Sequence, residues 1–137
     1  MGKRKSSHEG SRRARRLLLE LLEDRRLLTA TPQGEDFRVN QLVSGIQQLG
    51  GGGDAVGIDA LGNFVVAYTG AAASRTTDIF AQRFSPSGDR LGDQVRVNQY
   101  VSGGQDGAVV AMRPDGQFVV AWAGKGATDS AGIFFTQ

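Results

Sequence analysis

Residues 62–70 read GNFVVAYTG, and the same pattern returns at 116–124 as GQFVVAWAG. Successive side chains of a strand point to opposite faces, so each run places apolar groups on both faces. Continuous apolar runs of this length are typical of strands that are buried on both sides. We therefore predict two equivalent strands, at 64–68 and 118–122, each covered on both faces.

A second repeated block lies on the N-terminal side of each of these strands. Residues 37–47, FRVNQLVSGIQ, return at 95–105 as VRVNQYVSGGQ, an offset of 58 residues, whereas the first block returns at an offset of 54. The difference of four residues predicts an insertion near the glycine run at 50–53. Internal repetition at this spacing indicates a repeat architecture.

Short strands separated by turns account for the rest of each repeat. Gly makes up 20 of the 137 residues, about twice its usual share of about 7%, and SPSG at 85–88 and PDG at 114–116 are turn signals. The expected strands are 55–58, 64–68, 78–84, 94–98, 108–112, 118–122 and an apolar end at 133–137.

Four short strands in roughly 55 residues match one blade of a β-propeller. The predicted fold class is all-β, with antiparallel β-meander repeats that are propeller-like and comprise one full blade and part of a second. Such a chain cannot close a ring of about 4 to 8 blades. The open alternatives are a truncated member of a larger family, assembly with copies of itself, and a small open sandwich; we expect residues 31–137 to self-associate.

The net charge of +2 conceals a division of the chain. Residues 1–30 carry 9 basic and 4 acidic side chains, or +5, whereas the rest carries 7 and 10, or −3. The first segment also places Leu on one side of a helical wheel after an N-cap at Ser11, which predicts a short amphipathic helix. The predicted organisation is a basic arm and Leu-rich leader at 1–30, a linker at 31–36, a first β-repeat at 37–92 and a second, incomplete one at 93–137.

The basic arm has four interpretations from its residues alone. Charged side chains interrupt its apolar stretch, unlike the core of an ordinary secretory signal, while its first six residues fit the loose N-myristoylation pattern. Its Lys and Arg side chains could contact phosphates, although no aromatic residue is present to stack on bases. Membrane-surface or nucleic-acid binding through this arm is therefore the alternative function, and the simplest interpretation is a solvated charged helix.

The leader also resembles a known family. Residues 19–30, LELLEDRRLLTA, resemble the LEPR-XLL domain over about 12 residues, with Thr29 where the pattern usually has Ser. That domain heads large, repeat-containing bacterial surface or exported proteins. The resemblance implies an exported chain, at the cell surface or outside the cell.

The repeats show a second resemblance. The phrases NFVVAY at 63–68, IFAQRF at 79–84 and LGDQVRVN at 91–98 are similar to tandem repeats of long bacterial surface and haemolysin-like calcium-binding proteins. This resemblance implies architecture and location rather than a particular chemistry. We interpret the repeats as a structural, adhesive or other interaction module that binds surface-protein partners or copies of itself, with calcium binding as an alternative. The turns hold isolated carboxylates without the Asp-x-Asp-x-Asp-Gly spacing of a calcium loop. We expect Asp59, Asp89, Asp106 and Asp115 to shape turns instead.

The remaining inventory favours a protein without catalytic activity. The chain has no Cys and a single His, His8, so Ser44 and Ser102 have no histidine base in the repeats. No catalytic, cofactor-binding or metal-binding residue is predicted, and no run of about 18 apolar residues could cross a membrane. Tyr68 and Trp122, at equivalent strand positions, are expected to be core aromatics.

Overall fold

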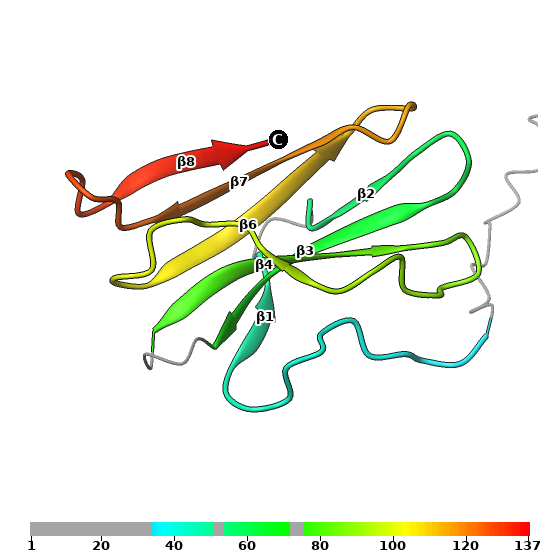
Figure 1. Cartoon of the computed structure of the whole chain (residues 1–137), viewed down its shortest axis with the longest axis horizontal. Coiled ribbons are helices and arrows are strands. Elements are labelled where there is room, and N and C mark those ends of the chain that lie inside the picture. The colour runs from blue at the N-terminus through cyan, green and yellow to red at the C-terminus, as the bar shows by residue number, and fades with distance from the viewer. Residues whose placement is uncertain (1–33, 51–53, 72–75) are drawn as a thin grey trace, which may run out of the picture. The chain divides into compact units, whose positions relative to one another are not determined.

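The computed structural model of the chain describes residues 34–50, 54–71 and 76–137. Within these residues the chain is all-β, and its strands pair antiparallel in two sheets that lie one against the other (Figure 1). The predicted all-β class with antiparallel sheets is confirmed, and neither sheet closes into a barrel over the described ranges. The predicted N-terminal helix, with the whole leader at 1–30, lies outside these ranges.

The first sheet has the strand order β1-β3-β4-β5, and the short strand β2 pairs with the same side of β3 as β1 does. The second sheet has the order β6-β7-β8. The strands of the first sheet are β1 (Gln47–Leu49), β2 (Val56–Ile58), β3 (Phe64–Ala71), β4 (Thr77–Phe84) and β5 (Val95–Arg96), and those of the second are β6 (Gln105–Met112), β7 (Phe118–Gly124) and β8 (Gly132–Thr136).

β1 and β2 together occupy the place that β6 alone occupies in the second sheet. Gln47 pairs with Gly70 as Gln105 pairs with Gly124, and the pairing of β2 with β3 matches that of the C-terminal half of β6 with β7. The glycine run at 50–53 falls between the two short strands, where the sequence predicted an insertion. β6 carries its own irregularity at the same point, a shift of register between Asp106 and Val109.

Three turns of the same geometry connect strands within the sheets. They span 59–63, 85–89 and 113–117, and in each the first N–H donates to the fifth carbonyl at 2.8–2.9 Å. The fourth residue of each turn is Gly62, Gly88 or Gly116, with φ between 84° and 87°. Side chains other than Gly are strained in this left-handed region. Gly88 and Gly116, which lie in the predicted turn signals, and Gly62 therefore have the same conformational role.

The core lies between the two sheets and is made by one face of each. The contributing side chains are small or β-branched in the first sheet, and they include a large aromatic in the second. The buried cluster comprises Val65, Ala67, Ile79 and Ala81 from the first sheet and Ala108, Val110, Val120 and Trp122 from the second. Backbone bonds reinforce the contact, because the N–H of Val110 donates to the carbonyl of Asp54 at 2.7 Å.

The two equivalent apolar strands differ in burial. β3 is covered on both faces, as predicted. The prediction for 118–122 is wrong, because Val120 and Trp122 point into the core while Val119 is 37% exposed and Ala121 is only partly covered. No described element lies over that second face of β7.

The boundary between the sheets falls one strand later than the boundary between the sequence repeats. β5 belongs to the second repeat by sequence, yet it pairs with β4 and completes the first sheet. Asn98 follows it, and its side-chain carbonyl accepts the N–H of Ile79 at 2.7 Å. The strand predicted at 94–98 is thus shortened, since a side chain replaces the last backbone bond of its ladder.

Candidate interaction surface

The residues considered for catalysis or metal binding do not converge in the structure. Ser44 and Ser102 are exposed, and no three His, Cys, Asp or Glu side chains lie together over residues 34–50, 54–71 and 76–137. Asp59 and Asp115 accept backbone N–H groups of their own turns, as predicted. Asp89 accepts the Ser87 hydroxyl within the turn at 85–89. The prediction is wrong for Asp106, which lies in strand β6 and accepts the N–H of Gly107 and the hydroxyl of Thr69 beside the register shift of that strand.

Asp59 is the most fully bonded of these carboxylates. One oxygen accepts the N–H groups of Leu61 and Asn63 at 2.9 Å each, and the other accepts the Asn63 side-chain amide at 2.8 Å. The bond from the Asn63 side chain is the main cause that lowers the pKa of Asp59 below 3.8, with the backbone bonds adding to it and desolvation opposing it. The ionised form of Asp59 therefore stabilises this turn.

Asp59→Asn should remove a pH-dependent part of the stability. A lowered pKa in the folded state means that the contribution is fully present above the unfolded value of 3.8 and is lost as the pH falls through the folded value. Urea denaturation at several pH values from neutral to below 3 measures the free energy of unfolding of the original chain and of the variant. The difference between these two free energies should become smaller on acidification. Asp93→Asn, outside the three turns, is the control, and a gap that stays constant with pH would contradict the role of the Asp59 charge.

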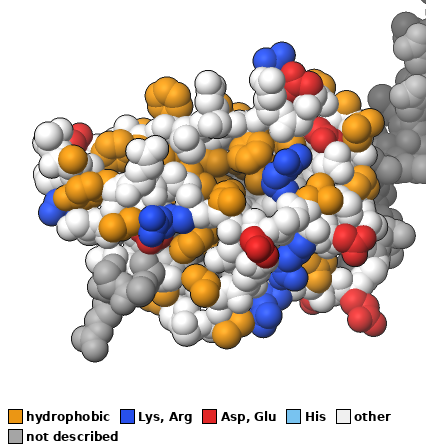
Figure 2. Space-filling view, viewed as in Figure 1, with side chains coloured by type: hydrophobic (Ala, Val, Ile, Leu, Met, Phe, Trp, Pro, Cys, Tyr) orange, Lys and Arg blue, Asp and Glu red, His pale blue; other side chains and the backbone are white. Residues whose placement is uncertain are grey.

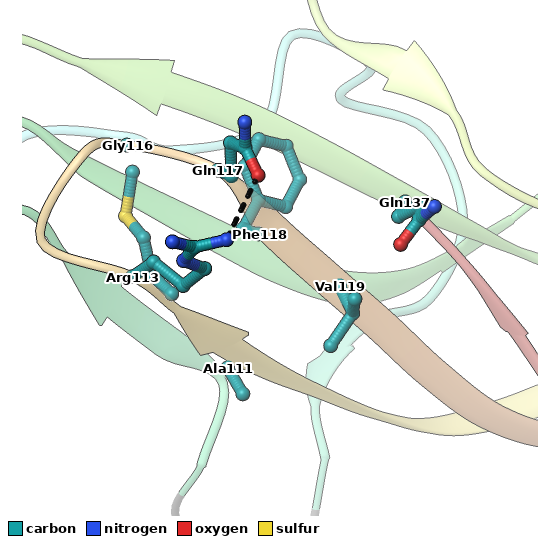
Figure 3. A pocket seen from close by; sticks show the side chains of 8 residues that line it. Ala111, Arg113, Gly116, Gln117, Phe118, Val119 and Gln137 are labelled. Carbon is teal, nitrogen blue, oxygen red and sulfur yellow. Dashed lines mark hydrogen bonds between the residues drawn. The ribbon is translucent and has the colours of Figure 1, made fainter.

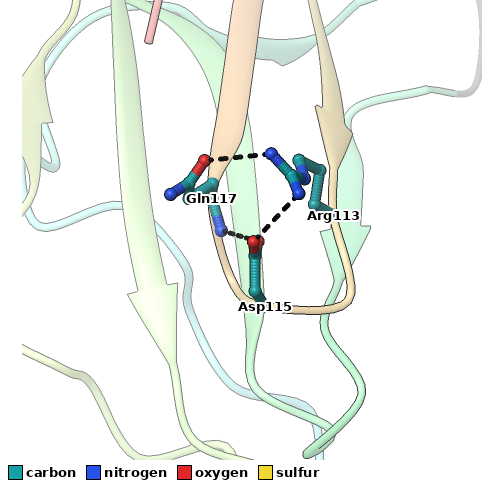
Figure 4. A network of polar contacts seen from close by, with 3 residues as sticks. All are labelled: Arg113, Asp115 and Gln117. Atoms are coloured by element: carbon teal, nitrogen blue, oxygen red, sulfur yellow. Dashed lines mark hydrogen bonds and ion pairs between the residues drawn. The ribbon is translucent and has the colours of Figure 1, made fainter.

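The equivalent turn of the second sheet uses different side chains. Arg113 stands where Asp59 stands in the first repeat, and its guanidinium lies 3.3 Å from a carboxylate oxygen of Asp115 and 3.4 Å from the amide oxygen of Gln117 (Figure 4). The two turns are neighbours, since the N–H of Ala60 donates to the carbonyl of Pro114 at 3.0 Å. Asp115 thus contacts a guanidinium and the backbone N–H of Gln117 within its own turn.

Tyr68 and Trp122 are buried core aromatics, as predicted. The Trp122 indole N–H donates to the Gln105 side-chain carbonyl at 3.0 Å, whereas the Tyr68 hydroxyl donates to Gln94 at 2.6 Å. Burial raises the pKa of Tyr68, with nearby Arg90 acting in the opposite direction. Each aromatic thus has a polar partner, which is expected for buried Tyr and Trp.

The outer face of the first sheet is covered by the segment before β1. The ring of Phe37 lies 5.3 Å from that of Phe84 and 6.5 Å from that of Phe64, between ring centroids. The backbone N–H of Gln41 donates to the Gln94 side chain at 2.8 Å. The segment 37–41 is therefore docked on the sheet without forming a strand.

In the second sheet, one face has no such cover among the residues that the structure describes. We call it the open face, and its members are apolar side chains contributed by all three strands. Figure 2 shows hydrophobic side chains at the surface, including the part of the view occupied by β6, β7 and β8. The open face comprises Val109 and Ala111 on β6, Val119, Ala121 and Ala123 on β7, and Ile133 and Phe135 on β8.

Exposure and shape both mark the open face as unusual. Ile133 is 77% exposed and Phe135 is 75% exposed. A hollow of about 620 Å³ lies at its hairpin end, lined among others by Ala111, Val119 and Gln137 (Figure 3). A second hollow, of about 380 Å³, lies over Val109 and Ala121. Contiguous apolar surface of this kind marks interaction sites.

The corresponding face of the first sheet is fully covered. At the offset of 54 residues, Val119 and Ala121 correspond to Val65 and Ala67, and both of these are 0% exposed. The full set of counterparts is Ala55, Gly57, Val65, Ala67, Thr69, Ile79 and Ala81, all buried. The sequence predicted no site here, although the apolar pattern on both faces of 118–122 was the signal that a cover is needed.

No helix in the described part of the chain has the length and apolar character to span a membrane. In comparisons with protein-family models, with curated proteins and with solved structures, none matched this chain.

Proposed function

We propose that the chain is an exported or cell-surface β-repeat protein without catalytic activity, whose repeats act as a structural or adhesive interaction module. The observation that carries this proposal is the open face, an apolar sheet surface whose counterpart in the first repeat is buried against the next repeat. A module of this kind functions by packing against another surface. The resemblance of residues 19–30 to a leader of exported surface proteins supports the location.

The sheets also support a propeller-like description of the repeats. The first sheet has four strand positions in sequential order, if β1 and β2 are taken as one interrupted strand, and the second has three. One sheet packs on the next through unlike faces, as neighbouring blades of a propeller do. We infer one blade-like unit and part of a second.

Fractionation of the source cells, followed by sequencing of the mature N-terminus, tests the proposed location. We expect the protein in the envelope or the medium, with an N-terminus at or just after Ala30. An intact Met1 on a cytosolic protein would contradict export. Deletion of residues 1–16 should leave the interactions of the repeats unchanged, whereas loss of all binding in that variant would favour the basic arm as the functional element.

A further inference from the structure

We propose that the open face and the free edge of β8 bind a second copy of this chain, head to tail, with residues 37–40 of the second copy as the strand that pairs with β8. This proposal deepens the proposed function by naming the partner of the interaction module. It rests on the internal repeat, because the chain already contains one example of the interface that it predicts.

The known example is the packing of the two sheets. In the first sheet, the edge of β4 is completed by β5, in which Val95 pairs with Ala81 and Arg96 pairs with Phe80. The next N–H, that of Val97, donates to the carbonyl of Ile79 at 2.8 Å. The second sheet then packs on the face of the first sheet that contains Ile79 and Ala81, next to this edge.

Over the described residues, the second sheet has no strand that corresponds to β5. β8 is the counterpart of β4, with Ile133 and Phe135 at the positions of Ile79 and Ala81, and no strand in the described ranges pairs with its other edge. An unpaired edge presents a row of backbone donors and acceptors, which is a template for a strand from another chain. The open face borders this edge, so one partner can satisfy both.

The strand that fits this edge occurs elsewhere in the chain. At the offset of 58 residues, β5 and Asn98 correspond to residues 37–40, FRVN against VRVN. In this structure these four residues form no strand and are held on the outer face of the first sheet by the Phe37 ring contacts. Asn40 and Asn98 each make the same local hydrogen bond, in which the side-chain amide donates to the backbone carbonyl two residues later.

The outer face of the first sheet is equivalent to the face of the second sheet that packs on the first. Its residues Phe64, Val66 and Tyr68 correspond to Phe118, Val120 and Trp122, the face with which the second sheet packs on the first. When residues 37–40 of one copy pair with β8 of another, this outer face can therefore lie on the open face. The contact joins unlike surfaces, and such contacts generate rings or open filaments rather than two-fold dimers.

Site-specific cross-linking tests the pairing, because the chain has no Cys of its own. By equivalence with Val95 and Ala81, residue 37 of one copy lies directly opposite residue 135 of the other, and directly opposed antiparallel residues are close enough for a disulfide. The full-length variants Phe37→Cys and Phe135→Cys, mixed under mild oxidation, should form predominantly 37–135 disulfides. Leu61→Cys in place of Phe37→Cys is the control, since Leu61 is a turn residue with 80% exposure that has no place in the interface.

Two cross-linking results would overturn the proposal. Predominant 135–135 disulfides would indicate a two-fold pairing of β8 edges, and equal yields with the Leu61 variant would indicate random collision. Light scattering gives an independent measurement: Phe135→Lys should weaken self-association at least about tenfold, as expected for an interface anchor, whereas Leu61→Lys should leave it unchanged. A chain that is monomeric at all concentrations would also overturn it.

The outcomes for location and for assembly are separable. A cytosolic chain with an intact Met1 that still forms the 37–135 disulfide would refute export and leave the head-to-tail contact standing. A chain that is exported but monomeric would support export and refute the head-to-tail contact.

Discussion

Trp122→Ala is expected to lower the free energy of unfolding by about 3–5 kcal/mol, in the range found when a buried large aromatic is truncated. The indole is 7% exposed, belongs to the cluster between the sheets and lies 6.1 Å from the Phe134 ring between centroids. Its loss also leaves the Gln105 side-chain carbonyl without the indole donor. Small domains are stable by only about 5–15 kcal/mol, so the effect is a large share of the total.

The matched control lies three residues earlier on the same strand. Val119→Ala removes a branched side chain from the open face, where the valine is 37% exposed, and should cost less than about 1 kcal/mol in the monomer. Urea denaturation at low protein concentration measures both variants. Similar losses in the free energy of unfolding for the two variants would mean that both faces of β7 are buried. That result would agree with the prediction from the sequence and contradict the structure.

Trp122→Phe separates the packing of the indole from its hydrogen bond. Phe keeps an aromatic ring in the cluster and removes the donor to Gln105, so the cost should be about 1–3 kcal/mol, the range for leaving a buried acceptor unsatisfied. A loss as large as that of the Ala variant would contradict a main role for packing between the sheets.

The strands and turns could be predicted from the sequence because their signals are local. The continuous apolar run at 64–68, the turn at 114–116 and the repeated FVVA phrase each depend on a few neighbouring residues. The difference between Val65 and Val119 could not be predicted in this way, because the two residues have the same local sequence. Their burial differs because the second sheet packs on the face that holds Val65, whereas no described element lies over the face that holds Val119.

β1 was missed for a similar reason. Residues 47–49, QQL, carry no apolar alternation, and the glycine run after them reads as a loop. The equivalence of Gln47 with Gln105 at the offset of 58 did not reveal the strand either, because the strand predicted in the second repeat began only at residue 108, whereas β6 begins at Gln105. The interaction surface could not be found from motifs either, because it consists of ordinary core residues without a cover.

Asn98→Ala is expected to cost about 2–4 kcal/mol, since it breaks a buried polar network at the end of β5. Asn98 is 3% exposed, accepts the N–H of Ile79 at 2.7 Å and donates to the Asp78 carboxylate at 2.8 Å and to the Tyr100 carbonyl at 2.9 Å. Alanine removes this donor from the buried Asp78 carboxylate and the acceptor from the Ile79 N–H, and buried polar groups that lose a hydrogen bond are costly.

The repeat supplies the control for this variant as well. Asn40 is the same residue of the first repeat, but it is only partly buried and its side-chain amide donates to the Leu42 carbonyl alone. Asn40→Ala should therefore cost less than about 1 kcal/mol in the monomer, and equal costs at the two positions would show that the local bond, rather than the buried network, determines the effect. In the head-to-tail assembly Asn40 takes the position of Asn98 beside Ile133, so Asn40→Ala should weaken self-association while leaving monomer stability nearly unchanged. Denaturation and light scattering on the same two variants then separate the contact that holds β5 in place within one chain from the contact that joins two chains.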